Sequence, residues 1–89
     1  MPRWLSPAVY RAVAAEVVAV REAAGLTQRD VAERLKIPHS VIAKIEIGER
    51  RLDAVEVIVL AQLFGIEPRD LLGRMASAVE RAQEPTTTC

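Results

Sequence analysis

The sequence predicts an all-α protein, a single compact domain of five helices. The chain has 89 residues, 51% of them hydrophobic but only 3% aromatic, which favours a helical bundle over a β sandwich. Apolar residues recur every three or four positions through most of the chain, as in helices that bury one face. Capping residues, prolines and glycines separate these segments. We place the domain at residues 6–82 and expect a polar, disordered tail at 83–89.

The first helix is predicted to begin at Ser6, whose hydroxyl can cap it, with Pro7 at the first helical position. No breaker follows until Gly25, which ends the helix. Residues 1–5 are expected to fray, although Trp4 can fold back onto the core. The apolar face of this helix is expected to contain Tyr10, Val13, Val17, Val20 and Ala24.

Two short helices joined by a tight turn are predicted next. Thr27 caps the first, Pro38 lies in the first turn of the second, and Gly48 ends the second. A second helix that opens on short polar side chains suits entry into a DNA major groove. The inward-facing residues are expected to be Val31, Ala32, Leu35, Ile42, Ile45 and Glu46. The outward-facing residues of the second helix are expected to be His39, Ser40, Ala43, Lys44 and Ile47.

The fourth predicted helix contains several strand-forming residues, so its helical assignment depends on its ends. Asp53 and Glu56 have the spacing of a capping box, and Gly65 provides a terminator. Pro68 then opens a fifth helix. The expected core face of the fourth helix is Val57, Leu60, Ala61 and Phe64, and the apolar positions of the fifth are Leu71, Leu72, Met75, Val79 and Ala82.

Several functional classes are disfavoured by what the sequence lacks. No apolar run approaches the length of about 18 residues expected of a membrane span, and the N-terminus does not resemble a signal peptide. Cys89 is the only cysteine, so no internal disulfide is possible and no cysteine–histidine cluster could bind a metal. We find no nucleophile–base pair, paired carboxylates or glycine-rich phosphate loop. We therefore expect a cytoplasmic protein without catalytic activity, cofactor or metal.

Charge is unevenly distributed along a chain whose formal net charge is zero. Residues 27–51 carry six basic and four acidic groups, whereas residues 52–89 carry three basic and six acidic groups. Neutrality argues against a nucleic-acid partner, but the excess positive charge lies on the paired short helices, where phosphates would be contacted. An ordinary mixed-charge surface is the alternative interpretation.

A longer pattern, running in order and without gaps over about residues 13–73, connects these segments. It comprises Gly25-Leu26-Thr27-Gln28, Val31-Ala32, Ile42, Ile45-Glu46, Gly48, Leu60-Ala61, Phe64-Gly65-Ile66 and Leu71-Leu72. This pattern resembles the lambda-repressor-like (Xre-type) helix-turn-helix family. The resemblance implies a five-helix domain that binds double-stranded operator DNA as a homodimer and regulates transcription of nearby genes.

The resemblance also implies roles for individual residues. His39, Ser40 and Lys44 occupy positions that contact base edges, and Val41 lies at their flank, where its methyl groups can meet a thymine methyl. Lys44 can donate to guanine, whereas what His39 offers depends on its tautomer and protonation state. His39 could instead be an exposed helix start. The positions implied to contact phosphate are Gln28, Arg29, Arg50 and Arg51. A solvated charged face is the alternative for Lys44, Arg50 and Arg51.

Two further positions match a structural feature of the family. Arg21 and Glu46 correspond to an ion pair that links the first helix to the third, where Gln28 is also implied to brace the recognition helix. Lys36 and Ile47 depart from the family pattern, which commonly has glycine and asparagine at these places. The substitution at Ile47 removes a phosphate contact and leaves a residue that could touch DNA sugars or another protein.

Surplus apolar residues on the last two helices predict an interface. Val55 and Val59 lie one turn apart, and the fifth helix extends beyond what a small core requires. We expect a two-fold dimer interface that contains Val55, Val59, Leu72, Met75 and Val79. Alternatively, Met75 and Val79 pack on Tyr10 and Val13 of the first helix. The same surplus leaves a second function open: an antitoxin, antiactivator or adaptor that binds a protein partner.

Overall fold

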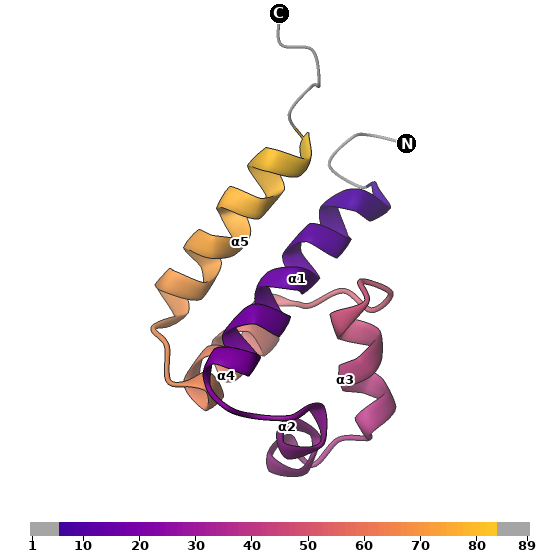
Figure 1. The fold of residues 1–89 in the computed structure, drawn as a ribbon, viewed down its shortest axis with the longest axis vertical. Helices are drawn as coiled ribbons and strands as arrows, with labels where there is room; N and C mark the ends of the chain where they lie inside the picture. Colours follow the sequence, from indigo (N-terminus) through magenta and orange to yellow (C-terminus); the bar gives the residue numbers. More distant parts are fainter. Residues whose placement is uncertain (1–5, 84–89) are drawn as a thin grey trace, which may run out of the picture.

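A computed structural model describes residues 6–83 of the chain (Figure 1). These residues form five helices, and none of them lies in a strand, so the predicted all-α class is confirmed. The helices are α1 (Pro7–Ala23), α2 (Gln28–Leu35), α3 (His39–Glu46), α4 (Ala54–Phe64) and α5 (Pro68–Gln83). Gln83 belongs to α5 rather than to the predicted tail. The predicted fraying of residues 1–5, the placement of Trp4 and the rest of the tail lie outside the described residues.

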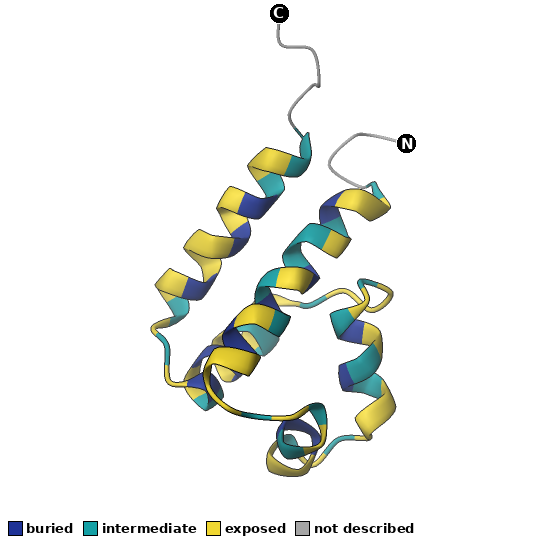
Figure 2. Ribbon diagram, viewed as in Figure 1, coloured by how far each residue is buried: buried dark blue, intermediate teal, exposed yellow. Residues whose placement is uncertain are grey.

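The helix α1 lies at the centre of the arrangement. It runs beside α5 on one side and contacts α3 on the other, while α2 packs against α3 and α4 packs against α5 (Figure 1). The buried positions of α5 lie along the side that faces α1 (Figure 2). The pair α2–α3 is thus held at the edge of the bundle, with one face of α3 turned to solvent.

The core is built from apolar residues of all five helices, and Val17, Val31 and Leu71 are its largest fully buried side chains. The predicted face of α1 is partly wrong. Ala24 is exposed and Tyr10 and Val13 are only half-buried, whereas Val9 and Ala14 are buried instead. Because α1 packs against both α3 and α5, its buried surface is wider than the single stripe that periodicity predicts.

Local hydrogen bonds account for most of the helix starts. Ser6 caps α1, and the predicted capping box of Asp53 and Glu56 is present at α4. A second capping box, which we did not predict, joins the Thr27 hydroxyl to the Asp30 amide and the Asp30 carboxylate to the Thr27 amide. The hydrogen bond that the Thr27 amide donates to the Asp30 carboxylate lowers the pKa of this carboxyl below its ordinary value. Pro38 is the N-cap of α3 rather than part of its first turn, and no side chain caps that helix.

The turn between α2 and α3 contains a strained residue. Lys36 ends α2 with φ 58° and ψ 44°, and no other non-glycine residue in the range 6–83 has a positive φ. A left-handed conformation costs an L-residue about 1–2 kcal/mol. Glycine at this position would remove that strain, but part of the gain in stability would be lost because glycine has a larger conformational entropy in the unfolded chain.

We therefore expect Lys36→Gly to raise the free energy of unfolding by up to about 1 kcal/mol, measured by urea denaturation. The matched control is Glu33→Gly, at an exposed position within α2. It should lower the same free energy by about 0.5–1 kcal/mol, because glycine is a poor helix former. A loss of stability in both variants would contradict strain at Lys36.

Candidate nucleic-acid interface

The exposed face of α3 carries the side chains that the sequence predicted to read bases. Ser40 and Lys44 are exposed on this face, and neither side chain forms a hydrogen bond or ion pair with another described residue. Ile42 and Ile45 are buried on the opposite side and fix the helix to the core. Ile47, at the end of α3, is 57% exposed, which leaves an apolar side chain beside the polar ones.

An ion pair joins α1 to the buried side of α3, as the resemblance implied. Arg21 Nε donates to Glu46 Oε2 at 2.6 Å, and Arg21 Nη2 donates to Glu46 Oε1 at 3.0 Å. Both side chains are nearly excluded from solvent, at 10% and 4% exposure. A further bond from Arg21 Nη1 to the Leu26 carbonyl oxygen, at 2.6 Å, ties the pair to the start of the α1–α2 turn. The hydrogen bonds to Glu46 raise the pKa of the Arg21 guanidinium above its ordinary value.

Gln28 extends this ion pair to the surface. Its Nε2 donates to Glu46 Oε1 at 2.8 Å, and its Oε1 lies 2.9 Å from His39 Nε2. The predicted bracing of α3 by Gln28 is therefore present as a contact between α2 and α3. One of the two Nε2 hydrogens is committed to Glu46, so Gln28 has one hydrogen left for a phosphate oxygen.

The two arginines after α3, both predicted phosphate contacts, already have partners within the chain. Arg50 forms an ion pair with Glu56, with Nη2 2.7 Å from Oε2 and Nη1 3.1 Å from Oε1. These hydrogen bonds lower the pKa of the Glu56 carboxyl below its ordinary value. Arg51 lies over the ring of Tyr10, 4.5 Å from its centroid. From the sequence, Glu56 is predicted only to cap α4, because nothing local indicates a contact across the α3–α4 loop.

Arg29, the remaining predicted phosphate contact, differs from Arg50 and Arg51. It is exposed in the first turn of α2, and its side chain has no hydrogen bond or ion pair within the described part of the chain. Its guanidinium group is therefore available to an external anion without breaking an internal contact.

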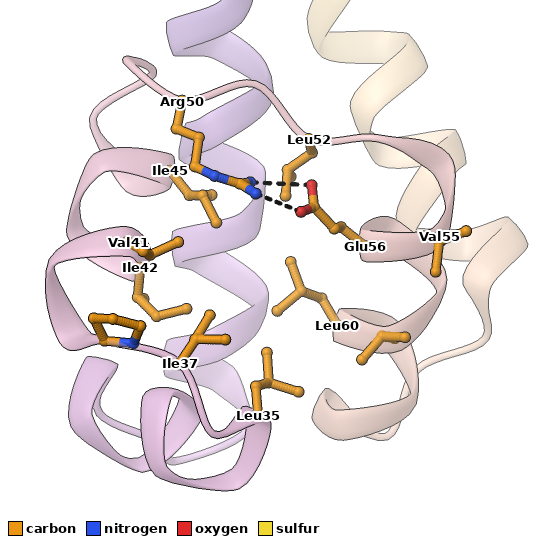
Figure 3. A pocket seen from close by; sticks show the side chains of 12 residues that line it. Leu35, Ile37, Val41, Ile42, Ile45, Arg50, Leu52, Val55, Glu56 and Leu60 are labelled. Atoms are coloured by element: carbon orange, nitrogen blue, oxygen red, sulfur yellow. Dashed lines mark hydrogen bonds and ion pairs between the residues drawn. The ribbon is translucent and has the colours of Figure 1, made fainter.

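An apolar hollow of about 350 Å³ lies behind α3, between the α2–α3 turn and α4 (Figure 3). Ile37 and Val41 line one side, Val55 lines the other, and the Arg50–Glu56 pair spans one end. Val41 is half-buried and packs against the core. It therefore lies on the α4-facing flank of α3 with part of its side chain exposed, and its contact with a thymine methyl stays a prediction.

The predicted dimer surface is only partly exposed. Val55, Val59 and Leu72 are exposed, at 68%, 36% and 59%. Met75, by contrast, is 5% exposed and belongs to the core, so its assignment to an interface is wrong. Val79 is half-buried and lines a groove together with Tyr10 and Val13. Met75 and Val79 thus lie along the side of α5 that packs on α1. This is the alternative that the sequence left open, in which the two residues pack on Tyr10 and Val13.

A further exposed apolar residue on α4, Ile58, was not predicted from the sequence; it is 44% exposed and lies between Val55 and Val59. The spacing of these three positions, at i, i+3 and i+4, could have predicted a continuous outward stripe.

No helix in the range 6–83 is long and apolar enough to span a membrane. Over the same range, no group of three or more histidine, cysteine, aspartate or glutamate residues could hold a metal ion.

Comparison with known families identifies the motif. A helix-turn-helix family model matches residues 18–71, more than half of the chain, from the middle of α1 to the start of α5. Comparison with curated proteins and with solved structures gave no significant match. The matched segment contains the capped α2, the turn at Lys36, the exposed α3 and the ion pair that anchors it. The chain therefore belongs to the lambda-repressor-like (Xre-type) helix-turn-helix family of DNA-binding domains.

Proposed function

We propose that this protein is a sequence-specific transcriptional regulator that binds an inverted-repeat operator as a homodimer in the cytoplasm, without catalysing a reaction. The observation that carries the proposal is the exposed, unpaired Ser40 and Lys44 on the second helix of a family-matched helix-turn-helix motif. Such a helix enters the major groove, where lysine donates to guanine O6 or N7 and serine donates to several acceptors. His39 completes the proposed set of base-reading residues. We leave out Val41, because its half-buried side chain lines the hollow beside α4.

Phosphate contacts are proposed for Gln28, Arg29, Arg50 and Arg51. Arg29 is available without rearrangement, whereas Arg50 would have to share its guanidinium with Glu56. The stacking of Arg51 on Tyr10 leaves the guanidinium N–H groups at the edge of the cation free to donate. These contacts would position the motif on DNA without specifying its sequence.

The proposal predicts different consequences for reading and positioning residues. Lys44→Ala is expected to weaken binding to preferred sites by about 1–3 kcal/mol and to relax base preference at one position. Arg51→Ala should weaken binding to all sequences about equally and reduce the salt dependence. Titrations of preferred and scrambled duplexes at several salt concentrations measure both effects. An unchanged base preference in Lys44→Ala would contradict the proposed reading face.

We further propose that the outward stripe of α4 (Val55, Ile58 and Val59), with Leu72 of α5, forms the dimer interface. Burial of apolar surface stabilises association by about 25 cal/mol per Å². A two-fold dimer would place two copies of α3 about 34 Å apart, the spacing of half-sites in successive major grooves. The support is the exposure of four apolar side chains on neighbouring helices.

Val59→Glu is expected to convert the dimer to a monomer, because it would place an unpaired charge in the buried interface. Sedimentation velocity measures the change, and circular dichroism checks that helix content is retained. Ser77→Glu is the matched control, since it adds the same charge at an exposed position of α5 outside the proposed interface. A wild-type monomer, or a dimer that persists in Val59→Glu, would contradict this interface.

A second function, binding of a protein partner by an antitoxin, antiactivator or adaptor, is favoured by the same exposed stripe and by the apolar hollow beside Val55. The internal pairing of Arg50 and the exposed Ile47 also fit a surface that is less suited to DNA. Salt dependence distinguishes the two functions. DNA binding that releases counterions falls steeply with salt. Absent or salt-insensitive DNA binding, together with a stable protein partner, would favour the second function.

A further inference from the structure

The hydrogen-bonded chain from Arg21 to His39 fixes which hydrogen-bonding group the histidine presents. Its innermost member, Glu46, is held by two hydrogen bonds from the Arg21 guanidinium and is 4% exposed. A carboxylate paired in this way with arginine is ionised, and an ionised carboxylate only accepts hydrogen bonds.

Because the Glu46 carboxylate can only accept, it determines the orientation of the Gln28 side-chain amide. The oxygen and nitrogen of an amide have nearly the same shape, so their assignment must follow from the partners. The atom that lies 2.8 Å from Glu46 Oε1 must donate and is therefore the amide nitrogen. The Gln28 carbonyl oxygen is then the atom that faces His39, at 2.9 Å from Nε2.

The Gln28 carbonyl oxygen in turn determines which nitrogen of the His39 ring carries a proton. A carbonyl oxygen cannot donate, so His39 Nε2 must carry a proton whenever this contact is made. In the neutral ring, the other nitrogen, Nδ1, is then a bare acceptor. His39 is exposed at the first position of α3, next to Ser40, and no hydrogen bond within residues 6–83 involves Nδ1.

We propose that Gln28 holds His39 as the Nε2–H tautomer, so that Nδ1 reads an exocyclic amino group of adenine or cytosine in the major groove. The only base-edge donors in that groove are adenine N6 and cytosine N4, whereas guanine and the thymine carbonyl present acceptors that would oppose the Nδ1 lone pair. Gln28 is thus a positioning residue for base recognition. The base-reading part of this inference rests on the proposed DNA-binding function, whereas the tautomer does not.

The tautomer can be tested in the free protein. Because His39 is the only histidine, nitrogen-15 labelling of the full chain gives a single imidazole spectrum that needs no assignment. At about pH 8, where histidine side chains are ordinarily neutral, Nε2 should carry the proton. That proton should exchange with water about threefold to tenfold more slowly than in Gln28→Ala, as expected for one lost hydrogen bond.

Gln62→Ala is the matched control, since Gln62 is an exposed glutamine on α4, outside this hydrogen-bonded chain. It should leave the exchange rate unchanged. A proton on Nδ1, or equal exchange rates in wild type and Gln28→Ala, would overturn the proposed role of Gln28.

Base reading is tested by selecting bound duplexes from a random pool at the same pH. Wild type should select adenine or cytosine at one position by about threefold to tenfold, and His39→Ala should lose that preference while keeping the others. His39→Lys, whose ammonium only donates, should shift the position toward guanine or thymine.

The outcomes separate the two proposals. An unchanged selection in His39→Ala, or a wild-type preference for guanine or thymine at that position, would overturn base reading by Nδ1 while DNA binding stands. If wild type selects no sequence at all, the proposed DNA function fails and base reading fails with it. The proton-exchange experiment would still decide the tautomer.

Discussion

Replacing Arg21 by methionine is expected to lower the free energy of unfolding by about 3–5 kcal/mol. The substitution leaves the Glu46 carboxylate, which is 4% exposed, without its cationic partner, and an unpaired buried charge is costly. It also removes the hydrogen bond to the Leu26 carbonyl oxygen. For a small domain, this loss is a large part of the total stability.

Urea denaturation followed by circular dichroism measures the effect, and two further variants identify its cause. Arg74→Met breaks a pair with Glu16 at a similar distance, 3.0 Å, but Arg74 is 48% exposed, so the loss should stay below about 1 kcal/mol. The double variant Arg21→Met/Glu46→Leu should recover most of the lost stability, because a well-packed apolar pair often replaces a buried ion pair at little cost. Equal losses for Arg21→Met and Arg74→Met would contradict the buried character of the pair.

Gly48→Ala is expected to lower the free energy of unfolding by about 2–4 kcal/mol, the sum of left-handed strain and steric overlap. Gly48 follows α3 with φ +83°, and a Cβ atom there would lie 3.1 Å from Arg11 Cγ and 3.2 Å from both the backbone nitrogen and the Cα atom of Arg11. Because two of these three atoms belong to the backbone of α1, the overlap cannot be relieved by a side-chain rotation alone. The end of α3 would have to move away from α1.

Gly65→Ala separates the two contributions to this loss. Gly65 has a similar φ, +75°, but an added Cβ would meet no atom within 4 Å. Its replacement should cost only the left-handed strain, about 1 kcal/mol. Thermal or urea unfolding of both variants gives the difference directly. If Gly65→Ala were as destabilising as Gly48→Ala, the close approach of α3 to α1 would not be the cause.

Local signals in the sequence predicted the helices well because helix ends are determined by nearby residues. The hydroxyl of Thr27, the carboxylate of Asp53 and the left-handed glycine at 65 act over three or four positions, so their spacing alone identifies the ends. The Pro38 boundary was misplaced by one residue, because proline suits both the N-cap and the first turn of a helix.

Contacts between helices were harder to predict. Periodicity alone could not show that Met75 packs in the core while Leu72 is exposed, since a spacing of three positions places both on nearly the same side of α5. The pairing of Arg50 with Glu56, and the contact of Gln28 with His39, depend on how a loop or a turn brings two helices together. The Arg21–Glu46 pair was anticipated because the family pattern carries that information, which spacing does not.

The pairing of α1 with α5 has a consequence for the order of folding during synthesis. The helix α1 is translated before α5 and packs along it, and the core residues Met75 and Ala78 of α5 lie beyond the segment matched by the family model. Contacts so distant in the chain cannot form until α5 has left the ribosome. The DNA-binding motif is thus translated early but acquires its supporting core late. Until then its apolar faces are open to chaperones, proteases and other nascent chains.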